Sequence, residues 1–315
     1  MIGFGLVGVG SWGVNYIETI KKISEVQLRW VYSPSKNALP VLLKDCKFTN
    51  NYENLLEDNE VKGIIISTPP ATHYDLAKAA LNANKDVLVE KPMTLYSKEA
   101  LELHNLSLEK SKILMVGHIY IYHPGVQKLK EIIKQGELED LFYFHSERCN
   151  LEQKRFDVNV LWDLAPHDFS IMNYLFEGSP VSINVQGNTV FNSGVENIMD
   201  VLFEYSKNFS GSVHNSWISP KKKREIILVG RNKYALFDDL SKKKLMLYDQ
   251  NKHLSYYPPL SKKNPLEIEC LHFLDCIMNK KQPLTGGYEG YVNVKLLEAA
   301  QQSLISGKKV FIEKF

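Results

Sequence analysis

The sequence predicts an α/β protein with two parts: an N-terminal doubly wound parallel sheet, then an α+β domain with an open, mainly antiparallel sheet. Three observations predict this class. The chain has 315 residues, a length that suits two domains better than one core. Strand and helix patterns alternate over residues 1–118, and several of these strands are apolar on both faces. Beyond residue 118, consecutive strands are joined by short turns, which indicates antiparallel pairing.

The first 118 residues alternate regularly between strand and helix. The runs 64–66 and 87–89 contain only Ile, Val and Leu, so both faces of these strands need cover, as in a parallel sheet between two helix layers. Strands are expected at 2–9, 27–32, 47–49, 63–67, 86–90 and 113–117. Helices are expected at 12–23, 38–43, 52–56, 73–81 and 98–109. We place the first domain at 1–118.

Residues 119–315 follow another order and form the second predicted domain. A helix at 124–134 has an apolar stripe and ends at Gly136. Further helices are expected at 166–176, 265–278 and 288–305. Strands are expected at 141–147, 181–190, 197–205, 210–218, 224–229, 234–238 and 244–248. We expect the last two helices to pack back against the first domain.

Composition excludes several classes of protein. Hydrophobic residues make up 44% of the chain, enough to form packed cores. Lys and Arg number 38 against 36 acidic residues, so a net charge of +2 gives no general attraction to nucleic acid or to a membrane. The four cysteines form no C-x-x-C pair, and we expect neither a disulfide framework nor a metal site. With no leader pattern and no bilayer-spanning apolar run, the expected location is the cytoplasm.

A glycine-rich turn follows the first predicted strand. Gly8, Gly10 and Gly13, with Ser11 and Trp12 between them, spell G-x-G-x-x-G where a strand ends and a helix begins. The free N–H groups of a helix N-terminus bind phosphate, and glycines let a pyrophosphate approach the backbone closely. In this context the pattern predicts a dinucleotide site; the alternative is a coincidental glycine-rich turn.

The residues after the second strand bear on the choice of dinucleotide. Ser33 lies twenty residues after Gly13, where an acidic residue normally binds the adenosine ribose. No acid is present, whereas Ser33 and Ser35 can donate hydrogen bonds to a 2′-phosphate and Lys36 can add charge. This favours NADP over NAD and leaves NAD open, because the loop could simply be permissive.

Three further motifs contain residues with the chemistry of an active site. Thr68-Pro69-Pro70-Ala71-Thr72-His73 and Glu90-Lys91-Pro92 each follow a strand, at the edge where doubly wound sheets bind ligands. Trp162-Asp163-Leu164-Ala165-Pro166-His167-Asp168 is the third. Its Asp163 and His167 are four residues apart, so they share one helix face if the helix begins as early as Asp163.

Taken with the glycine turn, these motifs resemble the glucose-fructose oxidoreductase, inositol dehydrogenase and rhizopine-catabolism (Gfo/Idh/MocA) family, whose N-terminal domain is a Rossmann fold. The resemblance covers essentially the whole chain, including residues 269–276 and 283–287. It implies that Lys91 binds the substrate hydroxyl, that His167 acts as acid and base, and that Asp163 orients or assists it. It also implies cofactor contacts from Gly8, Gly10, Trp12, Gly13, Thr68, Pro69, His73 and Glu90.

Substrate contacts are expected from residues beyond the last strand of the first domain. The family places cleft contacts at His118 and Tyr120, and weaker candidates are Tyr122, Arg148, Asn150 and Trp162. Lys91 could instead be a surface lysine, and His167 a packed or capping histidine. The family often has Arg-Phe-Asn-Pro where this chain has Tyr-Ile-Tyr-His-Pro at 120–124, so any contact made by that arginine is absent here.

The expected reaction is interconversion of a ring hydroxyl and a ketone on a sugar, a cyclitol or a nucleotide-linked sugar. The residues at 162–168, with Arg148 and Asn150 upstream, look most like members that act on nucleotide-linked amino sugars. Two alternatives stay open: an NAD-dependent glycoside hydrolase or lyase, and a non-catalytic dinucleotide-sensing regulator. The resemblance also implies a homodimer or homotetramer formed through an uncovered sheet face, with which the alternation of Val181, Ile183 and Val185 agrees.

Overall fold

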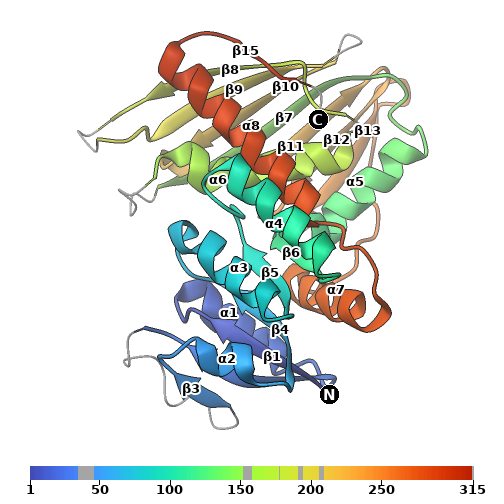
Figure 1. Ribbon diagram of the computed structural model, residues 1–315. Helices are drawn as coiled ribbons and strands as arrows, with labels where there is room; N and C mark the ends of the chain where they lie inside the picture. Colours follow the sequence, from blue (N-terminus) through green and yellow to red (C-terminus); the bar gives the residue numbers. More distant parts are fainter. Residues whose placement is uncertain (35–45, 152–157, 177, 191–193, 206–208, 314–315) are drawn as a thin grey trace. The chain divides into compact units, whose positions relative to one another are not determined.

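The computed structural model describes residues 1–34, 46–151, 158–176, 178–190, 194–205 and 209–313. The chain divides into two compact units (Figure 1). The first contains Met1–Tyr122 and Lys263–Val294, and the second contains His123–Lys262 and Lys295–Phe315. The C-terminal segment of the chain thus contributes to both units.

A parallel sheet forms the centre of the first unit. Within the described residues it has six strands in the order β3-β2-β1-β4-β5-β6, which is the Rossmann order and confirms the predicted doubly wound sheet. Its central strands are fully buried at Ile64–Ile66 and Val87–Val89, as the two-sided apolar pattern predicts. The strands are β1 Ile2–Val7, β2 Val26–Tyr32, β3 Lys47–Thr49, β4 Val61–Ile66, β5 Asp86–Glu90 and β6 Leu114–Gly117.

Helices connect these strands. They are α1 Ser11–Ile20, α2 Glu53–Glu57, η2 Pro70–Thr72, α3 His73–Asn82, α4 Ser97–Glu109, η3 Ile119–Tyr122 and α7 Pro265–Asn279. Although α7 comes late in the sequence, it packs against α1 and η3, and its Phe273 ring lies 5.4 Å from the ring of Phe4 on β1. The helix expected at 38–43 lies outside the described residues.

A second sheet forms the centre of the second unit. In the described part of the chain its order is β14-β13-β12-β11-β7-β10-β9-β8-β15, and every pair is antiparallel except β7 with β10. The mainly antiparallel sheet is therefore confirmed, with two short edge strands, β14 and β15, that the sequence did not predict. The strands are β7 Leu141–Leu151, β8 Ser182–Asn188, β9 Ile198–Glu204, β10 Ser210–Ser216, β11 Ile218–Gly230, β12 Lys233–Asp238, β13 Leu245–Asp249, β14 Leu254–Tyr256 and β15 Val310–Phe311.

The helices of this unit are α5 Pro124–Lys134, α6 Val160–Leu175 and the C-terminal part of α8 Gly287–Ser306. The predicted start of α6 at residue 166 is wrong by six residues. Asn159 caps the helix, because its side-chain oxygen accepts the Trp162 N–H at 3.3 Å, and Pro166 lies inside the helix. None of the helices in the described ranges is long and apolar enough to cross a membrane.

One expectation about the second sheet is wrong. Ile183 and Val185 were expected on an uncovered face, but they are 0% and 3% exposed. The end of α8 covers this part of β8, where Ser303 Oγ accepts the Val185 N–H at 3.0 Å. The neighbouring strand β9 exposes Asp200, Leu202 and Glu204 instead, so the uncovered face is of mixed polarity.

Candidate active site

The glycine turn follows β1 and shapes the backbone for a phosphate group. Gly8 has a φ of +95°, a left-handed conformation that favours glycine. A Cβ on Gly13 would lie 2.2 Å from the Gly8 carbonyl oxygen, so helix and strand pack too closely there for any side chain. A Cβ on Gly10 would meet no described atom within 4 Å. Open space therefore lies beside the exposed glycine at the start of α1.

The N-terminus of α1 is suited to an anion. No side chain of the described residues caps it, and its first turn contains no acidic residue. The first intrahelical bond runs from the Val14 N–H to the Gly10 oxygen at 3.1 Å, which leaves the N–H groups of Ser11, Trp12 and Gly13 without intrahelical acceptors. These groups and the open space at Gly10 fit the pyrophosphate of a dinucleotide.

The loops after β4 and β5 are held together by His73. Its side chain is fully buried, with Nδ1 2.9 Å from the Pro92 oxygen and Nε2 2.8 Å from the Thr68 oxygen. Burial lowers the pKa of His73, and the Lys91 ammonium lowers it further. Through one contact to each loop, His73 thus holds both loops in position.

Glu90 and Lys91 lie at the carboxyl end of β5. The Glu90 side chain is 6% exposed; its Oε2 accepts the Lys91 backbone N–H at 3.1 Å and its Oε1 accepts the Tyr16 hydroxyl at 2.9 Å. A Cβ on Gly117 of the adjacent strand β6 would lie 3.2 Å from the Glu90 carboxyl carbon. Glycine at 117 therefore gives this carboxylate room, and Lys91 is left partly exposed beside it.

His118 follows β6 on the same side of the sheet. It is 1% exposed, and neither ring nitrogen has a hydrogen-bond partner among the described residues. Burial and the nearby Lys91 ammonium lower the pKa of His118 to about 3, so its ring is neutral at physiological pH. His118 and Lys91 thus lie near each other at the edge where the glycine turn also lies.

Helix α6 of the second unit presents Asp163 and His167 on one face, as the spacing of four predicts once the helix begins at Val160. Both are partly exposed, whereas most of this helix is buried. Asp163 Oδ2 accepts the Trp217 indole N–H at 3.1 Å. The indole N–H of Trp162 donates to Gln301 Oε1 at 3.1 Å, which anchors the start of the helix.

Several other predicted site residues are hydrogen-bonded within their own unit. Arg148 and Asp168, 3% and 0% exposed, form an ion pair at 3.0 Å. Asn150 Oδ1 accepts from Arg224 at 2.7 Å. Tyr122 is 1% exposed and its hydroxyl lies 2.9 Å from Thr285 Oγ1. Tyr120 is half-exposed, and Ser33 is buried. Ser35 and Lys36 lie outside the described residues.

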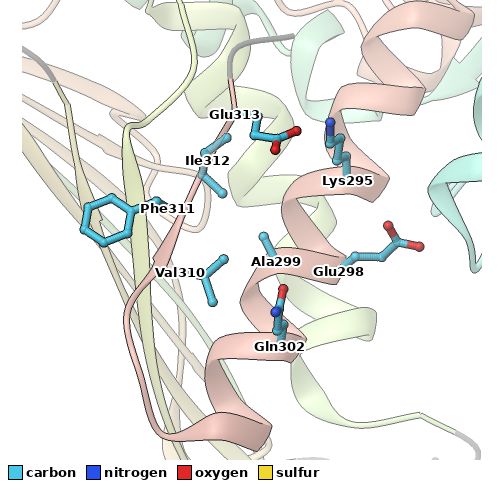
Figure 2. Close-up of a pocket in the computed structure, with 8 residues that line it drawn as sticks. All are labelled: Lys295, Glu298, Ala299, Gln302, Val310, Phe311, Ile312 and Glu313. Atoms are coloured by element: carbon cyan, nitrogen blue, oxygen red, sulfur yellow. The ribbon is translucent and has the colours of Figure 1, made fainter.

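Two further features involve other side chains. Glu147, Cys149 and His214 could offer ligand atoms within 4.8 Å of one another, a grouping that the sequence did not reveal. Lys223 Nζ lies 2.9 and 2.7 Å from the two Glu147 carboxylate oxygens, however, and supplies the positive charge there. A hollow of about 280 Å³ lies between α8 and β15, and no predicted site residue lines it (Figure 2).

The fold and the glycine turn define the class of protein. Residues 2–118 match the model of the oxidoreductase family with an NAD-binding Rossmann fold, GFO_IDH_MocA, and residues 126–235 match the GFO/IDH/MocA C-terminal domain. The chain belongs to the Gfo/Idh/MocA family of oxidoreductases, which confirms the resemblance seen in the sequence.

Particular relatives carry more specific names. The chain is 27% identical over 243 residues to UDP-N-acetylglucosamine 3-dehydrogenase of Acidithiobacillus ferrooxidans, a match that spans 75% of this chain and 74% of that one. It is 23% identical over 336 residues to scyllo-inositol 2-dehydrogenase (NAD(+)) of Bacillus subtilis, across 98% of this chain and 95% of that one. A solved structure of UDP-N-acetylglucosamine 3-dehydrogenase from Acidithiobacillus ferrooxidans aligns with 97% of this chain and 98% of that chain, with a TM-score of 0.87 and 23% sequence identity. This likeness shows the shared fold.

Two residues of the first unit were missed by the sequence reasoning. Tyr16 and Glu269 meet Glu90 in the core, although they lie on α1 and α7. The one available signal was the position of Glu269 in the stretch 269–276, which carries part of the family resemblance.

Proposed function

We propose that this protein is an NAD(P)-dependent dehydrogenase that interconverts a ring hydroxyl and a ketone on a sugar, a cyclitol or a nucleotide-linked sugar. One observation supports this most directly: the glycine turn follows β1, Thr68 follows the adjacent β4, and Lys91 and His118 follow β5 and β6. In a sheet of this order, ligands bind outside the carboxyl ends of the strands, where the strand order reverses. The names of the relatives agree with this reaction class.

The chemistry follows from the groups that the chain offers. When bound, the nicotinamide ring supplies the carbon that accepts or gives the hydride. Lys91 binds the substrate oxygen and its ammonium stabilises the negative charge that develops as the C–H bond breaks. An unprotonated ring nitrogen of His167 takes the O–H proton, and Asp163 orients the imidazole. In the reverse direction His167 returns that proton to the ketone oxygen.

For the cofactor, we propose NADP in preference to NAD. Ser33 directly follows β2, at the position where a carboxylate would repel a 2′-phosphate. The motif at 162–168, with Arg148 and Asn150 upstream in the sequence, resembles members that act on nucleotide-linked amino sugars and supports such a substrate, in line with the UDP-N-acetylglucosamine 3-dehydrogenase relative.

We also propose a cytoplasmic homo-oligomer. None of the four cysteines, all of which lie in the described residues, is in a disulfide, as expected in a reducing compartment. On the second sheet, Leu202 and Tyr143 are 54% and 36% exposed, and a second copy of the chain would cover such groups. Light scattering after size-exclusion chromatography measures this directly, and a monomer at micromolar concentration would contradict it.

The test of function combines mass spectrometry of the copurifying dinucleotide with a turnover panel. The panel contains UDP-N-acetylglucosamine, other nucleotide sugars, free sugars and inositols. We expect a keto product formed in a one-to-one ratio with reduced cofactor. Product without net change in cofactor would indicate a glycoside hydrolase or lyase instead, and dinucleotide binding without turnover of any compound would favour the regulator.

A further inference from the structure

Three side chains from distant parts of the sequence meet in the core of the first unit. Tyr16 on α1 and Glu269 on α7 are 0% exposed, and Glu90 at the end of β5 is 6% exposed. The Tyr16 hydroxyl lies 2.9 Å from Glu90 Oε1 and 3.3 Å from Glu269 Oε1. One phenol therefore bridges two buried carboxyl groups.

The hydrogen-bond donors available to the two carboxyl groups indicate which of them is charged. Tyr16 has a single hydroxyl proton, which serves one acceptor, and the shorter contact is to Glu90. Glu90 Oε2 also accepts the Lys91 N–H at 3.1 Å, whereas Glu269 Oε2 has no partner among the described residues. A buried carboxylate with an unpartnered oxygen costs far more than a neutral carboxyl group in the same place.

The surroundings of Glu269 also favour its neutral form. The titratable groups that face it are Tyr16 from α1, Glu90 from β5, Tyr122 from η3 and Cys270 from α7 itself. None of these, in the part of the chain described, is a cation.

The two carboxyl groups differ in their electrostatic support. Burial raises the pKa of Glu269 well above its usual value, and the Glu90 charge raises it further. Burial also raises the pKa of Glu90, but the Lys91 ammonium, the Tyr16 hydroxyl and the Lys91 N–H oppose this rise. The charge is therefore best placed on Glu90.

We propose that Glu269 is a positioning residue that stays protonated at neutral pH: it donates its proton to the Tyr16 hydroxyl oxygen, which in turn donates to Glu90 Oε1. This chain of two hydrogen bonds holds Glu90 as the charged neighbour of Lys91. The proton on Glu269 follows from the core geometry alone, and its effect on turnover rests on the proposed function.

The first experiment measures unfolding against pH for the full-length wild type, Glu269→Gln and the control Glu267→Gln. Glutamine mimics a protonated glutamate, and Glu267 is a partly exposed glutamate on the same helix. A protonated Glu269 must ionise on unfolding, so its stabilising contribution is full below the unfolded pKa of about 4.3 and is lost as pH rises toward the higher folded pKa.

We therefore expect the wild type to lose stability relative to Glu269→Gln as pH rises from about 5 to 8, with a change of about tenfold in the relative unfolding constant per pH unit. Glu267→Gln should show no such slope. A difference between wild type and Glu269→Gln that stays constant with pH would overturn the proposal, because a constant offset reports packing alone.

The second experiment measures turnover and dinucleotide affinity. Glu269→Gln should keep the wild-type kcat, because its amide can still donate to Tyr16. Tyr16→Phe should lower kcat by about tenfold or more, with dinucleotide Kd unchanged, because Glu90 loses a charge-assisted hydrogen bond. A large loss of kcat in Glu269→Gln would refute the positioning role. If the wild type turns over nothing, the proposed function fails while the pH experiment still decides the state of Glu269.

Discussion

Alanine at two glycines of the turn should affect two different properties: stability at Gly13 and dinucleotide affinity at Gly10. At Gly13, an alanine Cβ would lie 2.2 Å from the Gly8 carbonyl oxygen, more than 1 Å inside ordinary contact, and that oxygen belongs to the backbone. Overpacking of this kind costs about 1–3 kcal/mol. For a unit of about 150 residues this lowers Tm by roughly 2–12 °C.

At Gly10 the fold has room for the same methyl group. No described atom lies within 4 Å of an added Cβ, and the φ of −65° suits alanine. Alanine is a poorer N-cap than glycine by up to about 1 kcal/mol, and the reduced freedom of the unfolded chain returns about 0.4–1 kcal/mol. Stability should therefore change little. A bound pyrophosphate would meet the methyl group, so dinucleotide affinity should fall at least about tenfold, which corresponds to about 1.4 kcal/mol.

The assay is calorimetric titration of each full-length variant with NADPH and NADH, alongside thermal unfolding without ligand. Gly10→Ala should bind weakly and melt like the wild type, whereas Gly13→Ala should melt earlier. Unchanged dinucleotide affinity in Gly10→Ala would refute the assignment of the glycine turn as the pyrophosphate site.

Two further predictions concern the second unit and the cofactor. Asp168→Ala should destabilise the protein by about 3–5 kcal/mol in denaturant titrations, because it leaves the 3% exposed Arg148 guanidinium without its carboxylate partner; an effect below about 1 kcal/mol would contradict the importance of this pair. Ser33→Asp should weaken NADPH binding by about tenfold or more while NADH binding holds or improves, because a carboxylate repels the 2′-phosphate. Equal effects on both cofactors would contradict the NADP preference.

The sequence predicted the first sheet well because two independent signals agreed there. Runs such as Ile64–Ile66 require cover on both faces, and the glycine turn requires a strand before it and a helix after it. The second unit was harder. The helix was expected to begin at Pro166, and proline suits a first turn, whereas the cap made by Asn159 determines the observed start. Alternation at Ile183 and Val185 defines a face but not which face a helix covers.

The core network around Glu90 could not be predicted for a different reason. Tyr16 and Glu269 each look ordinary in the sequence, and their meeting depends on how α1, β5 and α7 pack. Likewise, Arg148 was a reasonable substrate candidate by residue type, and only the structure reveals its buried partner Asp168. Local patterns predict elements, whereas contacts between different elements, 20 residues apart for Arg148 and Asp168 and 253 for Tyr16 and Glu269, follow from the packing of the whole unit.

The proposed reaction is tested most directly by turnover in Lys91→Ala and His167→Ala, measured on the compound selected by the panel and alongside dinucleotide affinity. We expect each variant to bind the dinucleotide and to lose turnover by about a hundredfold or more, because each removes a group that acts on the substrate oxygen. Near-normal turnover in either variant would contradict the proposed mechanism.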